Sequence, residues 1–191
     1  MPGRTPYNAY SAFVIPLASA LSCVARAKIV CTSGGSSQLG KIHLLLLGGV
    51  DEGAYVRLKG GVDLELRARM RYEIIEDDRE GMGPFRVTTR WYEYSLQESG
   101  GQAVVEYHWH PGGKSHEDRP HVHLGTAQLR PNAVMTKKQH LLTGRVTFEQ
   151  VIRQAIEYGV EPLCADWDDK LTAAETPHVL YRTWSVAPNM R

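Results

Sequence analysis

Apolar and charged side chains alternate strictly from Val62 to Ile74, with the apolar residues at the even positions and the charged residues at the odd positions. A period of two is typical of a β-strand that has one buried face and one solvated face. Gly60-Gly61 precedes this strand, and two adjacent glycines supply the positive backbone angles of a tight hairpin. The pattern therefore predicts a hairpin that joins a short strand at residues 54–58 to the long strand.

Three further strands follow with short connections. They are predicted at Arg86–Gln97, Ala103–His110 and His121–Gly125. In the first of them, Tyr92, Tyr94 and Leu96 share one face, whereas Trp91 and Glu93 share the other. Because consecutive strands with short turns usually pair as neighbours, we expect an antiparallel meander.

A helix is predicted after Thr147, which can cap its first turn together with Gln150 as the partner in a capping box. The following residues repeat apolar side chains at helical spacing, and Gly159 ends the pattern. The fold class expected from these elements is α+β. It is an antiparallel sheet of about four to six strands with a C-terminal helix packed on one face.

The two ends of the chain are less regular. Residues 1–50 are interpreted as a poorly patterned N-terminal extension, in which Leu44–Leu47 is either a buried strand or a helix fragment. Residues 51–165 are expected to form the α+β domain. The tail, residues 166–191, is expected to hold a short helix and an edge strand near Val179–Trp184.

No apolar stretch reaches the roughly 20 residues that a membrane-spanning helix needs. The nearest is Ala9–Ala25, which Pro16 interrupts and which loosely resembles a signal peptide. We interpret the protein as cytoplasmic with no membrane partner, and export by the N-terminal segment is the alternative.

Composition excludes several classes of protein. With 42% hydrophobic and 23% charged residues, the 191-residue chain is not fully disordered. A formal net charge of +1 argues against a strongly basic nucleic-acid coat, although a local basic patch is compatible with it. The three cysteines form no CxxC pair, which argues against a disulfide framework and against a cysteine zinc site.

Histidine provides the main functional signal, because five of the eight histidines fall between His108 and His123. Alternation places Glu106, His108 and His110 on one face of their strand, and His121 and His123 on one face of the next. If His110 pairs with His121, then His108 lies opposite His123, and four imidazoles and a carboxylate share one patch.

Three chemistries could use this patch. The first is acid–base catalysis on RNA, with His121 and His123 as acid and base and with His108 and His110 assisting. Its candidate substrate-binding residues are Arg90, Tyr92 and Arg145.

The second chemistry is metal binding by His108, His110, His121 and His123, with Glu106 as a further ligand of a divalent transition metal. The third is a plain polar face without chemistry, as in a non-catalytic binding module. Two other features have simple explanations. Arg67, Arg69 and Arg71 are interpreted as a stripe that forms salt bridges to flanking acids, and Lys137–His140 as a solvated loop.

Short motifs resemble a known family. Tyr92-Glu93-Tyr94, Pro120-His121-Val122-His123 and the helix after Thr143–Val146 resemble the layout of the bacterial TumE-like toxins. Tyr107–Pro111 together with Pro120–His123 is similar to an uncharacterised bacterial family related to those toxins. The resemblance implies the toxin of a toxin–antitoxin pair, which acts on RNA or a nucleotide and has an antitoxin as its partner.

Overall fold

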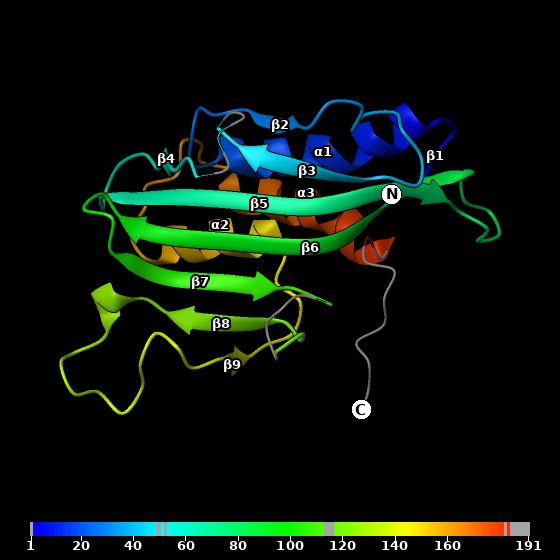
Figure 1. The fold of residues 1–191 in the computed structure, drawn as a ribbon. Helices are drawn as coiled ribbons and strands as arrows, with labels where there is room; N and C mark the ends of the chain where they lie inside the picture. The colour runs from blue at the N-terminus through cyan, green and yellow to red at the C-terminus, as the bar shows by residue number, and fades with distance from the viewer. Residues whose placement is uncertain (1, 49–50, 52, 113–116, 182, 184–191) are drawn as a thin grey trace.

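The computed structural model describes residues 2–48, 51, 53–112, 117–181 and 183 (Figure 1). Over these residues the chain forms three α-helices, a short 3-10 turn and nine strands. The helices are α1 (Pro6–Ser22), α2 (Phe148–Glu157) and α3 (Trp167–Leu180), and the turn is η1 (Thr126–Gln128). The strands are β1 (Pro2–Gly3), β2 (Ile29–Cys31), β3 (Ile42–Leu47), β4 (Val56–Arg57), β5 (Leu64–Glu76), β6 (Phe85–Glu98), β7 (Ala103–Trp109), β8 (His121–Leu124) and β9 (Leu141–Leu142).

The strands form one antiparallel sheet in the order β2-β3-β5-β6-β7-β8-β9, with β1 paired to β6 and β4 paired to β5. All three helices lie against the same face of this sheet, and no helix of the described residues lies on the opposite face (Figure 1). We call these the covered face and the open face. The predicted α+β class with an antiparallel sheet is confirmed.

The central strands β5 and β6 follow the predicted alternation. Leu66 and Ile74 are completely buried on the covered face, whereas Arg67 and Arg69 lie on the open face. The hairpin before β5 turns at Gly60-Gly61, where both residues have the positive φ that glycine adopts most easily. Because the even-numbered side chains of β5 are buried and apolar, this strand could be predicted from the sequence.

The predicted helix is α2, and it begins as expected. The backbone N–H of Gln150 donates to the Thr147 hydroxyl over 3.1 Å. In return, the backbone N–H of Thr147 donates to the side-chain oxygen of Gln150 over 3.1 Å. This reciprocal pair is a complete capping box. Val151 and Ile152 are fully buried against the covered face.

The N-terminal region differs from the expected extension. Residues 6–22 form α1, and Phe13 and Leu17 on this helix are buried in the same core as β5 and β6. The strand β3 contains the apolar run at residues 44–47 and pairs with β5, so the alternative of a buried strand is the one observed. The apolar positions of α1 lie four residues apart and form a buried stripe although Pro16 is inside the helix.

The C-terminal region also differs. The helix α3 extends through Val179 and Leu180, so the edge strand predicted there is wrong for these two residues, and Arg182 and Trp184 lie outside the described residues. Leu171 is fully buried on this helix, which packs against α1 with the rings of Phe13 and His178 5.2 Å apart. In the part of the chain that the structure describes, no helix is long and apolar enough to cross a membrane.

Candidate metal centre on the open face

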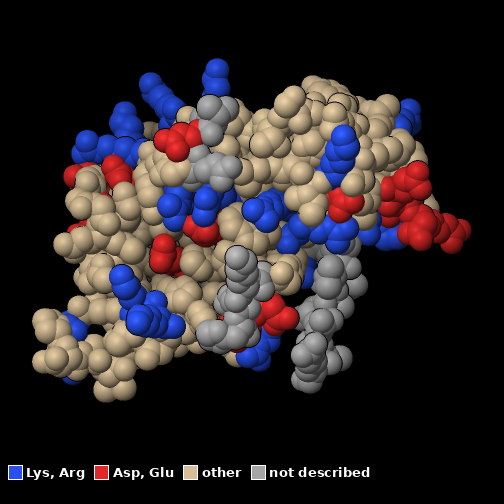
Figure 2. Space-filling view, viewed as in Figure 1, with Lys and Arg blue, Asp and Glu red and all other residues tan. Residues whose placement is uncertain are grey.

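The open face presents polar side chains from four adjacent strands. One cross-strand row runs through Arg69 of β5, Glu93 of β6, His108 of β7 and His121 of β8. Lys and Arg side chains gather over β5 and β6 in this view, next to acidic side chains (Figure 2). The charge on this face therefore changes from arginine at β5 through carboxylate at β6 to imidazole at β7 and β8.

The pairing of β7 with β8 differs by two residues from the predicted register. His108 lies opposite His121, and Glu106 lies opposite His123. The ladder does not reach His110, which follows the end of β7 and accepts a hydrogen bond from the Trp91 indole on β6. Because the difference is an even number of residues, every side chain stays on its predicted face.

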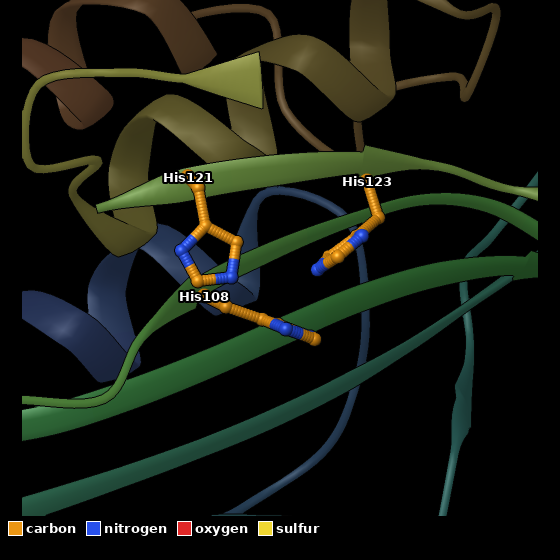
Figure 3. A group of neighbouring side chains, drawn as sticks. All are labelled: His108, His121 and His123. Atoms are coloured by element: carbon orange, nitrogen blue, oxygen red, sulfur yellow. The ribbon is translucent and has the colours of Figure 1, made fainter. Parts of the chain in front are cut away.

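Three histidines converge on the open face, and we call them the three-histidine cluster: His108, His121 and His123. Their ring centroids are 5.6 Å apart for His108–His121, 5.0 Å for His108–His123 and 5.0 Å for His121–His123. One nitrogen from each ring lies within 4.8 Å of one nitrogen of each other ring. Figure 3 shows the rings turned toward one another between β7 and β8.

Backbone carbonyls hold two of these rings. The Nδ1 atom of His121 lies 2.8 Å from the Arg119 carbonyl oxygen, and Nδ1 of His123 lies 3.1 Å from the Lys137 carbonyl oxygen. A carbonyl only accepts, so these contacts assign the hydrogen to Nδ1 and leave a lone pair on Nε2. The Nε2 atom of His108 is buried and has no hydrogen-bond partner. This arrangement matches the usual support of metal-ligating histidines, whose second nitrogen binds a carbonyl or carboxylate.

Burial favours the neutral form of His108 and His123. It lowers the pKa of His108 to about 3, and it also places the pKa of His123 below the ordinary value, with neighbouring histidine charge acting in the same direction. A neutral imidazole is the form that coordinates a metal ion. A neutral imidazole is a poor general acid at neutral pH, so these shifts favour a ligand role over an acid role for His108 and His123.

A fourth ring, His140, lies beside the cluster. Its centroid is 4.5 Å from that of His121 and 4.7 Å from that of His123. The prediction of a solvated loop for Lys137–His140 missed this proximity. The loop is brought back by β9, which pairs with β8 directly after His140, and a strand of two residues leaves almost no periodic signal in a sequence.

Two of the three arginines in the stripe form cross-strand salt bridges, as expected, and the carboxylate is Glu93 of β6. Arg67 and Arg69 donate to the two oxygens of Glu93 over 2.6 and 2.7 Å. Burial opposes the charge of Glu93, but the Arg69 hydrogen bond and the arginine charges still hold its pKa below the ordinary value. One oxygen of Glu93 also lies within 4.8 Å of ring nitrogens of His108 and His110.

Two predicted substrate-binding residues lie on the wrong side of the sheet. Tyr92 is 3% exposed on the covered face, where its hydroxyl accepts from the Val146 amide over 3.0 Å. The Arg145 guanidinium lies 3.8 Å from the centre of the Trp109 ring, which belongs to the same buried face. The alternation that puts Tyr92 with Tyr94 and Leu96 also excludes it from the histidine side.

The other predicted residues have partners near the cluster or beyond it. Arg90 donates to Glu73 over 2.8 Å. Glu106 lies opposite His123 and accepts from the Ser95 hydroxyl over 3.3 Å, and it is not part of the converging nitrogen group. His110 lies 5.0 Å from His108 between ring centroids. A pocket of about 680 Å³ lies elsewhere, between the β6–β7 turn and Tyr158.

Searches of protein-family models, curated proteins and solved structures found no match to this chain. The resemblance to TumE-like toxins therefore stays a prediction.

Proposed function

We propose that the open face binds one divalent transition metal ion, with zinc as the best fit, through Nε2 of His108, His121 and His123. The observation that carries the proposal is the pair of carbonyl contacts on Nδ1 of His121 and His123. These contacts leave both Nε2 lone pairs free to bind, in a cluster where one nitrogen of each ring lies within 4.8 Å of the others. Nε2 of His108 is buried without a hydrogen-bond partner among the described residues. Three neutral nitrogen ligands are a common donor set for zinc.

Three protein ligands leave coordination positions open, which distinguishes catalytic zinc sites from closed structural ones. A zinc ion held in this way supplies an activated water molecule or polarises a substrate oxygen. The proposed class is therefore a metal-dependent hydrolase, and the chain's contribution is to orient the three rings. The cluster lies on the open face of the sheet, between β7 and β8.

The experiment is metal binding to chelator-treated, dialysed protein. Zinc titration by calorimetry and cobalt titration by absorption should both give one site per chain, with tetrahedral cobalt bands. We expect His123→Ala to weaken zinc binding by at least about 100-fold, because one of three ligands is lost. The matched control is His43→Asn, which removes an imidazole that contacts Thr32 instead of the cluster. Equal zinc affinity in wild type and His123→Ala would overturn the proposal.

We also propose, as a second function, the toxin activity on RNA or a nucleotide that the family resemblance implies, with an antitoxin as partner. The observation in its favour is that Arg69 and Arg71 share the open face with the histidines, where they can attract an anionic substrate. Induced expression in bacteria tests it. Growth arrest by wild type but not by a soluble His121→Ala/His123→Ala variant is expected, and normal growth with both would contradict it.

A further inference from the structure

Trp91 of β6 contacts three side chains of the open face at once. Its indole N–H donates to Nδ1 of His110, and the two rings meet at a steep angle with centroids 5.0 Å apart. The guanidinium carbons of Arg69 and Arg71 lie 5.6 and 5.3 Å from the centre of the indole ring. The indole therefore positions one imidazole by a hydrogen bond and two cations by its π-face.

The hydrogen bond to Trp91 decides what His110 can do. An indole N–H only donates, so Nδ1 of His110 is the acceptor and its lone pair is occupied. The hydrogen of the neutral ring is then on Nε2, which is the opposite tautomer from His121 and His123. His110 thus offers a hydrogen-bond donor where the three-histidine cluster offers lone pairs, and this removes it from the predicted set of metal ligands.

Positive charge is available next to this donor. Arg71 is exposed and has no carboxylate partner among the residues that the structure describes, whereas Arg67 and Arg69 share the carboxylate of Glu93. Both guanidiniums lie against the indole whose N–H meets His110, so Trp91 brings His110 and Arg71 to one place on the open face.

We infer that Nε2–H of His110 and the guanidinium of Arg71, both positioned by Trp91, form a binding site for a phosphate group beside the three-histidine cluster. A guanidinium binds phosphate oxygens through two parallel hydrogen bonds, and a neutral imidazole N–H adds a third donor without adding charge. The charge of the Arg71 guanidinium suits a phosphate dianion. The phosphate site needs no metal, but its role in holding a substrate rests on the proposed function.

Calorimetric titration of inorganic phosphate into metal-free protein, in a chloride buffer, tests the site. We expect Arg71→Gln to weaken phosphate binding by about 10-fold or more, which corresponds to the loss of one charge-assisted hydrogen bond. Trp91→Phe keeps an aromatic ring but removes the indole N–H, and we expect a loss of about 3- to 10-fold. The control is Arg26→Gln, at an exposed position after α1, which should bind phosphate as wild type does.

Nitrogen NMR of the imidazoles gives a readout that a structural role of Trp91 alone would not move. The wild-type spectrum should show the His110 hydrogen on Nε2, and Trp91→Phe should shift His110 toward a mixture of tautomers while the tautomers of His121 and His123 stay unchanged. A nucleoside monophosphate, titrated in parallel, separates recognition of free phosphate from recognition of a phosphate ester.

The outcomes separate this site from the metal centre. If zinc binds as proposed but Arg71→Gln and Arg26→Gln bind phosphate as tightly as wild type, the phosphate site is wrong and the metal centre stands. If phosphate binding depends on Arg71 and Trp91 in a protein that binds no zinc, the phosphate site stands and the proposed metal centre is wrong. A His110 hydrogen on Nδ1 in the wild-type protein would also overturn the inference.

Discussion

The two faces of the sheet both hold histidine, and they treat it differently. On the covered face, His178 of α3 is 3% exposed and lies next to Glu149 of α2, with 3.4 Å between Nε2 and a carboxylate oxygen. On the open face, Nδ1 of His121 and Nδ1 of His123 each contact a backbone carbonyl. The two rings also contact each other, with centroids 5.0 Å apart. One arrangement pairs an acid with a base inside the core, and the other assembles bases alone.

Burial decides the state of the covered pair. It raises the pKa of Glu149 to about 7 and lowers the pKa of His178 to about 4, so each group resists its charged form. The pair is therefore neutral between these values and consistent with a packed core between α1, α2 and α3. Burial also favours the neutral form of His108 and His123 on the open face, but there the ring nitrogens of three histidines converge. The difference shows that histidine burial alone does not indicate a site, and that convergence of lone pairs does.

The largest expected effect is on the free energy of unfolding, and it distinguishes two variants on opposite faces of strand β5. Leu66 of β5 is completely buried on the covered face, and Leu66→Ala should lower the free energy of unfolding by about 2–5 kcal/mol because it leaves a cavity. Arg71→Gln, on the open face of the same strand, should change it by less than about 0.5 kcal/mol. Urea denaturation measures both values, and equal effects would contradict the assignment of the two faces.

The pH dependence of stability should reveal the covered pair. Glu149 has a raised folded-state pKa, so its contribution to stability is full below pH 4.5 and is lost as the pH rises toward 7. Glu149→Gln removes this loss, so the variant should gain about 3 kcal/mol relative to wild type between pH 4.5 and pH 8. Denaturation at several pH values tests this, with exposed Glu98→Gln as the control. A constant difference between Glu149→Gln and wild type across this range would disprove it.

Zinc should stabilise the protein through the open face alone. At a free zinc concentration about 100 times the Kd, binding to the native state adds about 2.7 kcal/mol to the free energy of unfolding. Thermal denaturation with zinc and with a chelator measures this gain. We expect it to disappear in His123→Ala and to persist in Glu149→Gln, and the reverse pattern would place the metal on the covered face.

The smallest expected effect concerns the start of α2. Thr147→Ala removes the side chain that accepts from the Gln150 amide, which should cost about 1 kcal/mol. Zinc and phosphate affinities should be unchanged, because Thr147 belongs to the covered side. Chemical denaturation and the two titrations test this separation, and a loss of zinc affinity in this variant would show that the faces are coupled.

Much of the fold could be predicted because its central elements leave local patterns in the sequence. The alternation in β5 and the cap of α2 are local patterns that burial on one side imposes. The helix α1 was missed since Pro16 and small residues weaken its pattern, and its apolar stripe is explained only by contacts with β5, β6 and α3. Such long-range contacts leave no trace in a short window of sequence.

The candidate site was predictable to the level of a face. Strand alternation puts His108, His121 and His123 on the same face of the sheet. A shift of the β7–β8 pairing by an even number of residues does not change that face. It could not show that Trp91 takes the lone pair of His110, because that contact crosses from β6 to a residue beyond the end of β7. The same alternation places Tyr92 on the covered face with Tyr94 and Leu96, away from the histidines that it was predicted to assist in substrate binding.

The packing of α1 against α3 has a consequence for synthesis on the ribosome. The apolar side chains Phe13 and Leu17 emerge early, whereas α3, which carries the neighbour His178 of Phe13, is translated after the whole sheet. Until that helix arrives, the nascent chain exposes part of the stripe on α1, and exposed apolar segments of this kind attract chaperones or associate with one another. Released chains that stop before residue 167 should therefore bind a chaperone more strongly than the released 191-residue chain.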